Sequence, residues 1–145
     1  MQNTFGNEGI DIVEIGGGYG GLCLCLHYFA PSFDINIKSY TIIDLTDVLR
    51  LQKMYLNSNG IQNVNFEDTV TYGKNIDKKN MFFISNYAFT ELHRDKQNQY
   101  LQDLFPKVKH GFMCWNMIDY YDFGFKTYVI DEIPKTGQYN KYVFF

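Results

Sequence analysis

"VEIGGGYGG", residues 13–21, is the stretch of this sequence that decides the fold. The β-branched apolar run that leads into it (9–15) predicts a buried strand, and the segment that follows (20–30) predicts a helix that ends before Pro31. A strand that enters a glycine-rich turn and then a helix forms a ligand cradle at the carboxyl end of a sheet. Glycine suits such a turn because it adopts positive φ and, having no Cβ, lets a ligand touch the main chain.

The rest of the chain alternates between strand-like and helix-like segments. We expect further strands at 35–44, 63–67, 80–87 and 109–118, helices at 46–60 and 90–105, and a final hairpin of strands 125–133 and 138–145. Thr46 and Thr90 are the expected N-caps of the two later helices, and Gly60 is the expected end of the first of these. The alternation predicts an α/β fold, a doubly wound, mostly parallel sheet with helices on both faces. An antiparallel hairpin at the end favours the methyltransferase variant of this sheet, because the ordinary dinucleotide-binding fold continues with parallel units.

Length and composition narrow the class of protein further. The 145 residues fit a single domain, 1–145, and 46% of them are apolar, which is ample for one core. No apolar run approaches the roughly 18 residues of a membrane span, and the first ten residues lack the features of a signal peptide, so we expect a cytoplasmic protein that does not enter a membrane. The net charge of -3, without a basic cluster beyond Lys78 and Lys79, disfavours nucleic acid as a partner. Three cysteines form neither a disulfide framework nor a paired zinc pattern.

The glycines of the turn fit two different nucleotide-binding patterns. Gly16, Gly18 and Gly21 satisfy G-x-G-x-x-G, the fingerprint of dinucleotide-binding proteins. Glu14, Gly16, Gly18 and Gly20 satisfy E-x-G-x-G-x-G, which resembles the first motif of S-adenosylmethionine-dependent methyltransferases. The glycines alone do not separate these two classes.

The charge of Glu14 favours S-adenosylmethionine. A dinucleotide brings a pyrophosphate to this turn, and a carboxylate about 6 Å from that anion would cost roughly 3 kcal/mol at an effective dielectric constant near 20. S-adenosylmethionine brings an ammonium and a sulfonium instead, which a carboxylate attracts. The alternative is that Glu14 only braces the loop by accepting hydrogen bonds.

Two further acids follow strands of the expected sheet. Asp44 ends the second strand, where a carboxylate accepts hydrogen bonds from a ribose diol; its alternative role is to cap the next helix. Asp68 follows the third strand, where a polar side chain reaches the adenine amino group of a bound nucleoside; "EDTVT" is equally typical of a solvated turn.

Three blocks of the sequence resemble the sugar O-methyltransferase family of class I S-adenosylmethionine-dependent enzymes: "VEIGGGYGGL", "YTIIDLTDVLRLQKMYL" and "ISNYAFTEL". The resemblance implies a seven-stranded sheet, S-adenosylmethionine as cofactor, and methyl transfer to a hydroxyl of a small acceptor such as a sugar. It places the methionine moiety on Glu14 and the glycines, the ribose on Asp44, and Asn86 beside the reacting methyl group. The expected cofactor-binding residues are Glu14, Gly16, Gly17, Gly18, Gly20, Asp44, Leu45, Asp68 and Asn86.

The sequence departs from the family pattern ahead of the first strand. Methyltransferases of this class carry helices there that close over the cofactor, whereas only about nine residues precede the strand here. We therefore expect the N-terminal lid helices to be absent. Three alternatives follow: a partner chain or a second copy of this chain supplies the missing cap, the site is open, or the chain is a truncated descendant of the family. A lidless binding or regulatory subunit without catalytic activity is the alternative to an enzyme, and an oxidoreductase that binds a dinucleotide is a third hypothesis.

The residues after the fourth expected strand supply the candidates for catalysis. A sugar hydroxyl needs a general base, and Glu91 and His93 lie close to the end of that strand. A histidine suits the role of a base near neutral pH, but both side chains also fit an exposed helix start, where an acid is favoured by the helix dipole. Asp119 and Asp122 are oxygen ligands in principle, but nothing in their spacing indicates a metal, and we expect none.

Overall fold

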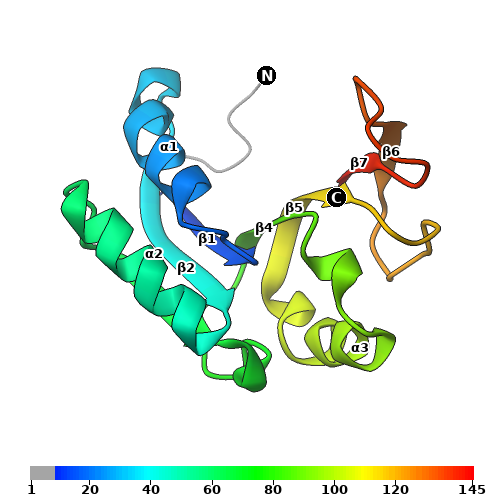
Figure 1. The fold of residues 1–145 in the computed structure, drawn as a ribbon, viewed down its shortest axis with the longest axis horizontal. Coiled ribbons are helices and arrows are strands. Elements are labelled where there is room, and N and C mark those ends of the chain that lie inside the picture. The colour runs from blue at the N-terminus through cyan, green and yellow to red at the C-terminus, as the bar shows by residue number, and fades with distance from the viewer. Residues whose placement is uncertain (1–8) are drawn as a thin grey trace.

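The computed structural model describes residues 9–145, and a single seven-stranded sheet runs through it (Figure 1). The strand order is β3-β2-β1-β4-β5-β7-β6, with every pair parallel except β5–β7 and β6–β7. The prediction of a mostly parallel sheet that closes with an antiparallel hairpin is confirmed. The strands are β1 (Ile10–Ile15), β2 (Ile37–Asp44), β3 (Val64–Asp68), β4 (Met81–Asn86), β5 (Val108–Trp115), β6 (Tyr128–Asp131) and β7 (Lys141–Phe144).

Helices cover both faces of the sheet, as the alternation predicts. Figure 1 shows α1 (Gly21–Phe29) and α2 (Thr46–Ser58) on one side and α3 (Arg94–Asp103) on the other. Short 3-10 turns complete the connections: η2 (Ala30–Phe33), η3 (Thr69–Thr71), η4 (Phe89–Glu91) and η5 (Phe105–Lys107). No helix within residues 9–145 is long and apolar enough to cross a membrane. The expectation about a signal peptide concerns the first ten residues, of which 1–8 lie outside the described part of the chain.

The two faces of the sheet carry two separate cores. Successive side chains of β1 alternate between them, because side chains of a strand point to opposite faces in turn. Ile12 packs with Tyr40 and Leu56 beneath α1 and α2, whereas Val13 and Ile15 pack into the larger core on the α3 face. Both clusters are buried, and this fixes which β1 residues face which helices.

The N-cap of each later helix differs from the prediction, although α2 starts at residue 46 as expected. The N-cap of α2 is Leu45, and Thr46 lies inside the helix because its hydroxyl donates to the carboxylate of Asp68 instead. The segment after β4 first forms η4, so α3 begins four residues late, with His93 as its N-cap; Thr90 is buried and its hydroxyl donates to the side chain of Asn116. In both cases a tertiary hydrogen bond takes the threonine hydroxyl away from the helix end.

The predicted end of α2 is confirmed. Gly60 has φ of 79° and donates its N–H to the carbonyl of Asn57, while Ile61 donates to the carbonyl of Leu56. This pair of bonds is the Schellman arrangement, which satisfies the last carbonyls of a helix and favours glycine. The helix therefore stops where the sequence indicates, and the chain turns toward β3.

Candidate functional site

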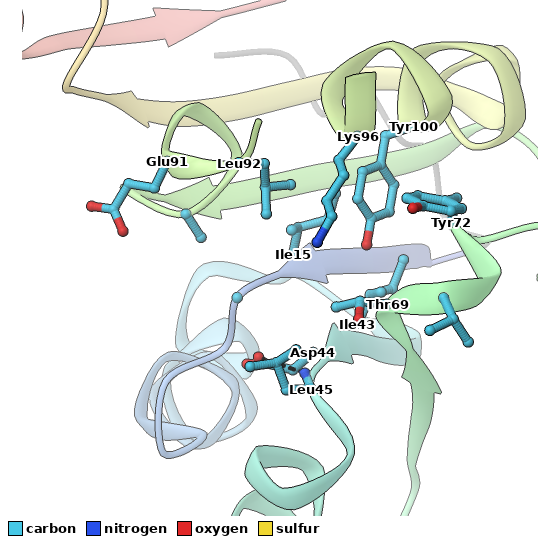
Figure 2. Close-up of a pocket in the computed structure, with 13 residues that line it drawn as sticks. Ile15, Ile43, Asp44, Leu45, Thr69, Tyr72, Glu91, Leu92, Lys96 and Tyr100 are labelled. Carbon is cyan, nitrogen blue, oxygen red and sulfur yellow. Dashed lines mark hydrogen bonds between the residues drawn. The ribbon is translucent and has the colours of Figure 1, made fainter. Parts of the chain in front are cut away.

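A cavity of about 420 Å³ opens at the carboxyl ends of the central strands (Figure 2). Its volume falls within the range of about 300–1,000 Å³ that is typical of small-molecule sites. Ile15 and Ile43 form its floor, the turn after β2 forms one wall, and η4 and α3 form the opposite wall. A position at the carboxyl edge of a doubly wound sheet is where such folds bind ligands.

The glycine turn meets this cavity at Gly16. Gly16 and Gly18 have φ of 74° and 56°, a backbone region that only glycine adopts readily. A Cβ at Gly16 would lie closer than 3.0 Å to the Cβ of Ala88, so the turns that follow β1 and β4 approach each other here. A Cβ at Gly18 would meet nothing within 4 Å, so the main chain of this residue is open. A Cβ at Gly17 would instead lie 2.8 Å from Ile42, inside the protein.

Asp44 lines the cavity at the carboxyl end of β2, as the sequence predicts for a residue that binds a ribose. One carboxylate oxygen accepts from the N–H of Leu45 at 2.8 Å, and the other accepts from Nε2 of Gln52 at 2.8 Å. Gln52 also donates to the carbonyl of Gly18 at 2.9 Å, so one amide joins Asp44 to the glycine turn. Asp44 does not cap α2, since Leu45 occupies that position.

Sequence reasoning missed Gln52, which is fully buried in α2. A signal was present, because Gln52 lies on the apolar stripe of this helix, three residues after Leu49 and four before Leu56. A polar residue on a buried stripe needs a hydrogen-bond partner, and here the partners belong to the site.

Glu14 lies beneath the glycine turn and does not line the cavity. Its side chain is 2% exposed on the α1 and α2 face, where Oε2 accepts from the Tyr40 hydroxyl at 2.8 Å. Burial raises the pKa of Glu14 to about 7; the Tyr40 hydroxyl opposes this shift, and the charge of Asp44 adds to it. The carboxyl is therefore close to half-ionised near neutral pH, and any attraction of a cation acts through the turn rather than by contact.

Asp68 caps η3 instead of lining the cavity. Its carboxylate accepts hydrogen bonds from the hydroxyl of Thr46 and from the N–H of Val70. Both bonds hold the pKa of Asp68 below its ordinary value, and the bond from Thr46 has the larger effect. Its neighbour Val70 lines the cavity and is 75% exposed, and Leu45, another expected site residue, lines it and is 61% exposed. The cavity therefore has two exposed apolar side chains where the sequence predicted a polar contact from Asp68.

The two candidate catalytic residues are separated by the structure. Glu91 lines the edge of the cavity, and its Oε1 accepts from Nδ2 of Asn116 at 2.8 Å. His93 does not line the cavity; it is exposed, with Nδ1 3.4 Å from a carboxylate oxygen of Asp95. The 3-10 turn η4 causes this separation, because Glu91 ends the turn whereas His93 begins α3.

Asn86 ends β4 as predicted, but it is not among the residues that line the cavity. Its Oδ1 is buried and has no hydrogen-bond partner within residues 9–145. The same part of the chain holds no group of three or more histidine, cysteine, aspartate or glutamate side chains arranged to bind a metal ion, and this includes Asp119 and Asp122.

Two residues of α3 complete the wall opposite Asp44, and the sequence did not single them out. Lys96 and Tyr100 lie one helical turn apart and both point into the cavity (Figure 2). Tyr72 from the end of η3 lies beside them, with its ring centroid 5.2 Å from that of Tyr100.

No protein-family model matches the chain, and no curated protein matches it. Solved structures do resemble it. They include LepI in complex with S-adenosylmethionine (TM-score 0.58, 16% identity, 78% of this chain and 28% of that chain). PKMT2 from Rickettsia typhi in complex with S-adenosylhomocysteine has a TM-score of 0.56 at 18% identity, over 77% of this chain and 22% of that chain.

A third similar structure is the ribosomal protein L11 methylase from Lactobacillus delbrueckii subsp. bulgaricus. It has a TM-score of 0.54 at 14% identity, over 74% of this chain and 51% of that chain. The chain has the fold that these methyltransferase-type structures share, and it spans between 22% and 51% of their lengths.

Proposed function

We propose that this chain binds S-adenosylmethionine in the cavity and transfers its methyl group to a hydroxyl of a small acceptor. The observation that carries the proposal is the position of Asp44 and Gly16 on one cavity of about 420 Å³ at the carboxyl edge of the sheet. The shared fold of LepI and PKMT2, which were crystallised with S-adenosylmethionine or S-adenosylhomocysteine, supports it.

The residues present fit such a nucleoside. Asp44 offers a carboxylate to the ribose hydroxyls, and Gln52 holds that carboxylate in place. Leu45 and Val70 offer exposed apolar surface to the faces of a purine ring. The open main chain at Gly18 leaves room for the methionine part of the cofactor, since no atom beyond its chain neighbours lies within 4 Å of a Cβ placed there.

The chemistry divides between the cofactor and the chain. S-adenosylmethionine, when bound, supplies a methyl group that is already activated on a sulfonium. The chain must orient the acceptor hydroxyl and take its proton, and positioning provides most of the rate gain in such a reaction. Glu91 is the candidate base, because it is at the cavity and His93 is not. Its bond to Asn116 fixes one carboxylate oxygen and leaves the other for an acceptor.

A sugar is the acceptor class that we propose, on the strength of the three sequence blocks described above. Transfer of a labelled methyl group from S-adenosylmethionine to a panel of monosaccharides and nucleotide sugars tests this. Labelling of a protein or nucleic acid, with no labelled sugar, would contradict it.

Replacement of Asp44 by asparagine is expected to weaken the binding of S-adenosylhomocysteine about 10- to 100-fold. The substitution keeps the shape of the side chain but replaces charge-assisted hydrogen bonds to the ribose with weaker ones, and about 1.4 kcal/mol corresponds to tenfold in affinity. Isothermal titration calorimetry on the wild type and the variant measures the change.

Asp47→Asn is the matched control, because Asp47 lies three residues further along, in the first turn of α2, where it is exposed and paired with Arg50 on the surface. It should bind as the wild type does. The proposed function would be wrong if the wild type gave no heat with millimolar S-adenosylhomocysteine, or if a dinucleotide bound in its place.

A further inference from the structure

The hydroxyl of Tyr100 is a buried polar group without a partner at the wall of the cavity. Tyr100 is 1% exposed, and its hydroxyl makes no hydrogen bond within the described residues. Burial raises the pKa of this phenol, so it stays protonated and able to donate or accept a hydrogen bond. An unpaired buried hydroxyl destabilises a protein, so its presence at a cavity indicates that a ligand supplies the partner.

Lys96 brings a second polar group to the same wall. Its ammonium makes no ion pair or side-chain hydrogen bond among residues 9–145. Figure 2 shows the lysine side chain running alongside the Tyr100 ring, with its nitrogen directed into the cavity rather than outward. Ile15, Ile43 and Leu92 line the same space with apolar side chains, and Thr69 and Tyr72 line it with hydroxyl-bearing ones.

The position of these groups relative to Asp44 restricts what they could bind. A ribose held by Asp44 on one wall would leave its base to the rest of the cavity, which Leu45 and Val70 line with exposed apolar side chains. The carboxylate of Asp68 is already engaged by Thr46 and by the N–H of Val70. In its place, α3 brings two polar groups to the cavity for the edge of a base, the partnerless hydroxyl of Tyr100 and the ammonium of Lys96.

We propose that Tyr100 and Lys96 bind the edge of the purine base of the cofactor, so that α3, and not Asp68, selects the base. This rests on the proposed function. Lys96 only donates hydrogen bonds, whereas Tyr100 donates or accepts. Adenine matches this pair, because it offers ring nitrogens as acceptors and an exocyclic amino group as donor.

Tyr100→Phe tests the proposal with two measurements that move in opposite directions. The variant should unfold at a midpoint about 3 °C higher than the wild type without ligand, because the unpaired hydroxyl is gone. It should bind S-adenosylhomocysteine about 2- to 12-fold more weakly, the range expected for one neutral hydrogen bond. Tyr128→Phe, at a 67% exposed site on β6, is the control and should change neither quantity.

Selectivity for the base provides the sharper test. The 1-deaza, 3-deaza and 7-deaza analogues of S-adenosylhomocysteine each lack one acceptor nitrogen. We expect the wild type to bind at least one of these analogues less tightly than S-adenosylhomocysteine itself. Lys96→Met should lose that discrimination. Lys96 is exposed, so this substitution should leave the fold intact.

The outcomes separate the two proposals. If the wild type binds no S-adenosylhomocysteine, the proposed function fails and this inference fails with it. If the wild type binds but Tyr100→Phe and Lys96→Met keep both its affinity and its discrimination, only this inference fails. A lower midpoint for Tyr100→Phe with unchanged affinity would assign the hydroxyl to the core alone.

Discussion

Replacement of Gly16 by alanine is expected to abolish nucleoside binding and to lower the free energy of unfolding by about 2–5 kcal/mol. Gly16 has φ of 74°, and a side chain in this backbone region costs roughly 1–2 kcal/mol. The new Cβ would also lie closer than 3.0 Å to the Cβ of Ala88, and such overpacking costs about 1–3 kcal/mol. Since both residues line the cavity, the turns after β1 and β4 must separate where the ligand binds. Urea denaturation and calorimetric titration with S-adenosylhomocysteine measure the two effects.

Two other glycines separate the strain from the clash. Gly60, at the end of α2, has φ of 79°, and a Cβ there would have nothing within 4 Å. The free energy of unfolding of Gly60→Ala should therefore fall only by the cost of backbone strain, and its affinity for S-adenosylhomocysteine should not change. Gly18 has the same open surroundings but lies in the glycine turn. Gly18→Ala should be destabilised like Gly60→Ala and yet bind more weakly, because its methyl group would occupy the open space proposed for the methionine part of the cofactor. Equal stability of the Gly16 and Gly60 variants would show that the approach of Ala88 is not restrictive.

The fold was predictable because its signals are local. The strand before the glycine turn, the apolar runs ending at Asp44 and Asn86, and the closing hairpin all follow from short-range periodicity and turn residues. The N-caps of α2 and α3 were not predictable, since they depend on which distant side chain takes a threonine hydroxyl. Asp68 takes that of Thr46 and Asn116 takes that of Thr90, and no local pattern specifies either pair.

The site was predictable where a residue's position at a strand end decides its surroundings. Asp44 and Gly16 lie at the cavity for that reason. Glu14 precedes Gly16 by two residues, but the alternation of β1 points it to the α1 and α2 face, whereas Ile15 forms the cavity floor. The cavity lies on the face of the sheet that α3 covers, and no local sequence pattern specifies that Tyr100 lies in its wall.

The free energy of unfolding is expected to depend on pH through Glu14. Its pKa rises from an ordinary value of 4.5 to about 7 in the folded chain, mainly because burial disfavours the carboxylate. A raised folded-state pKa means that the fold favours the protonated form, so this contribution is fully present below about pH 4.5 and is lost as the pH rises through about 7. The loss is about 3 kcal/mol, since each pKa unit corresponds to roughly 1.4 kcal/mol. Denaturation midpoints at a series of pH values measure it.

Glu14→Gln should remove most of this dependence. Glutamine keeps an acceptor for the Tyr40 hydroxyl but does not ionise, so the variant should match the wild type near pH 4 and exceed its free energy of unfolding by up to about 3 kcal/mol at pH 8. Glu67→Gln on β3 is the control, and its profile should follow that of the wild type. A variant that is less stable than the wild type at pH 8 would contradict the cost assigned to the buried charge.

The same variant distinguishes attraction of the sulfonium from simple support of the loop. S-adenosylmethionine carries a positive charge on sulfur that S-adenosylhomocysteine lacks, so a charged Glu14 favours the first ligand over the second by about 0.5–1 kcal/mol through the turn. Glu14→Gln should therefore lower the ratio of their affinities about two- to fivefold at pH 8, where wild-type Glu14 is ionised, and hardly at all at pH 5.5. Equal weakening of both ligands at both pH values would mean that the carboxyl group shapes the turn without selecting the charge of the ligand.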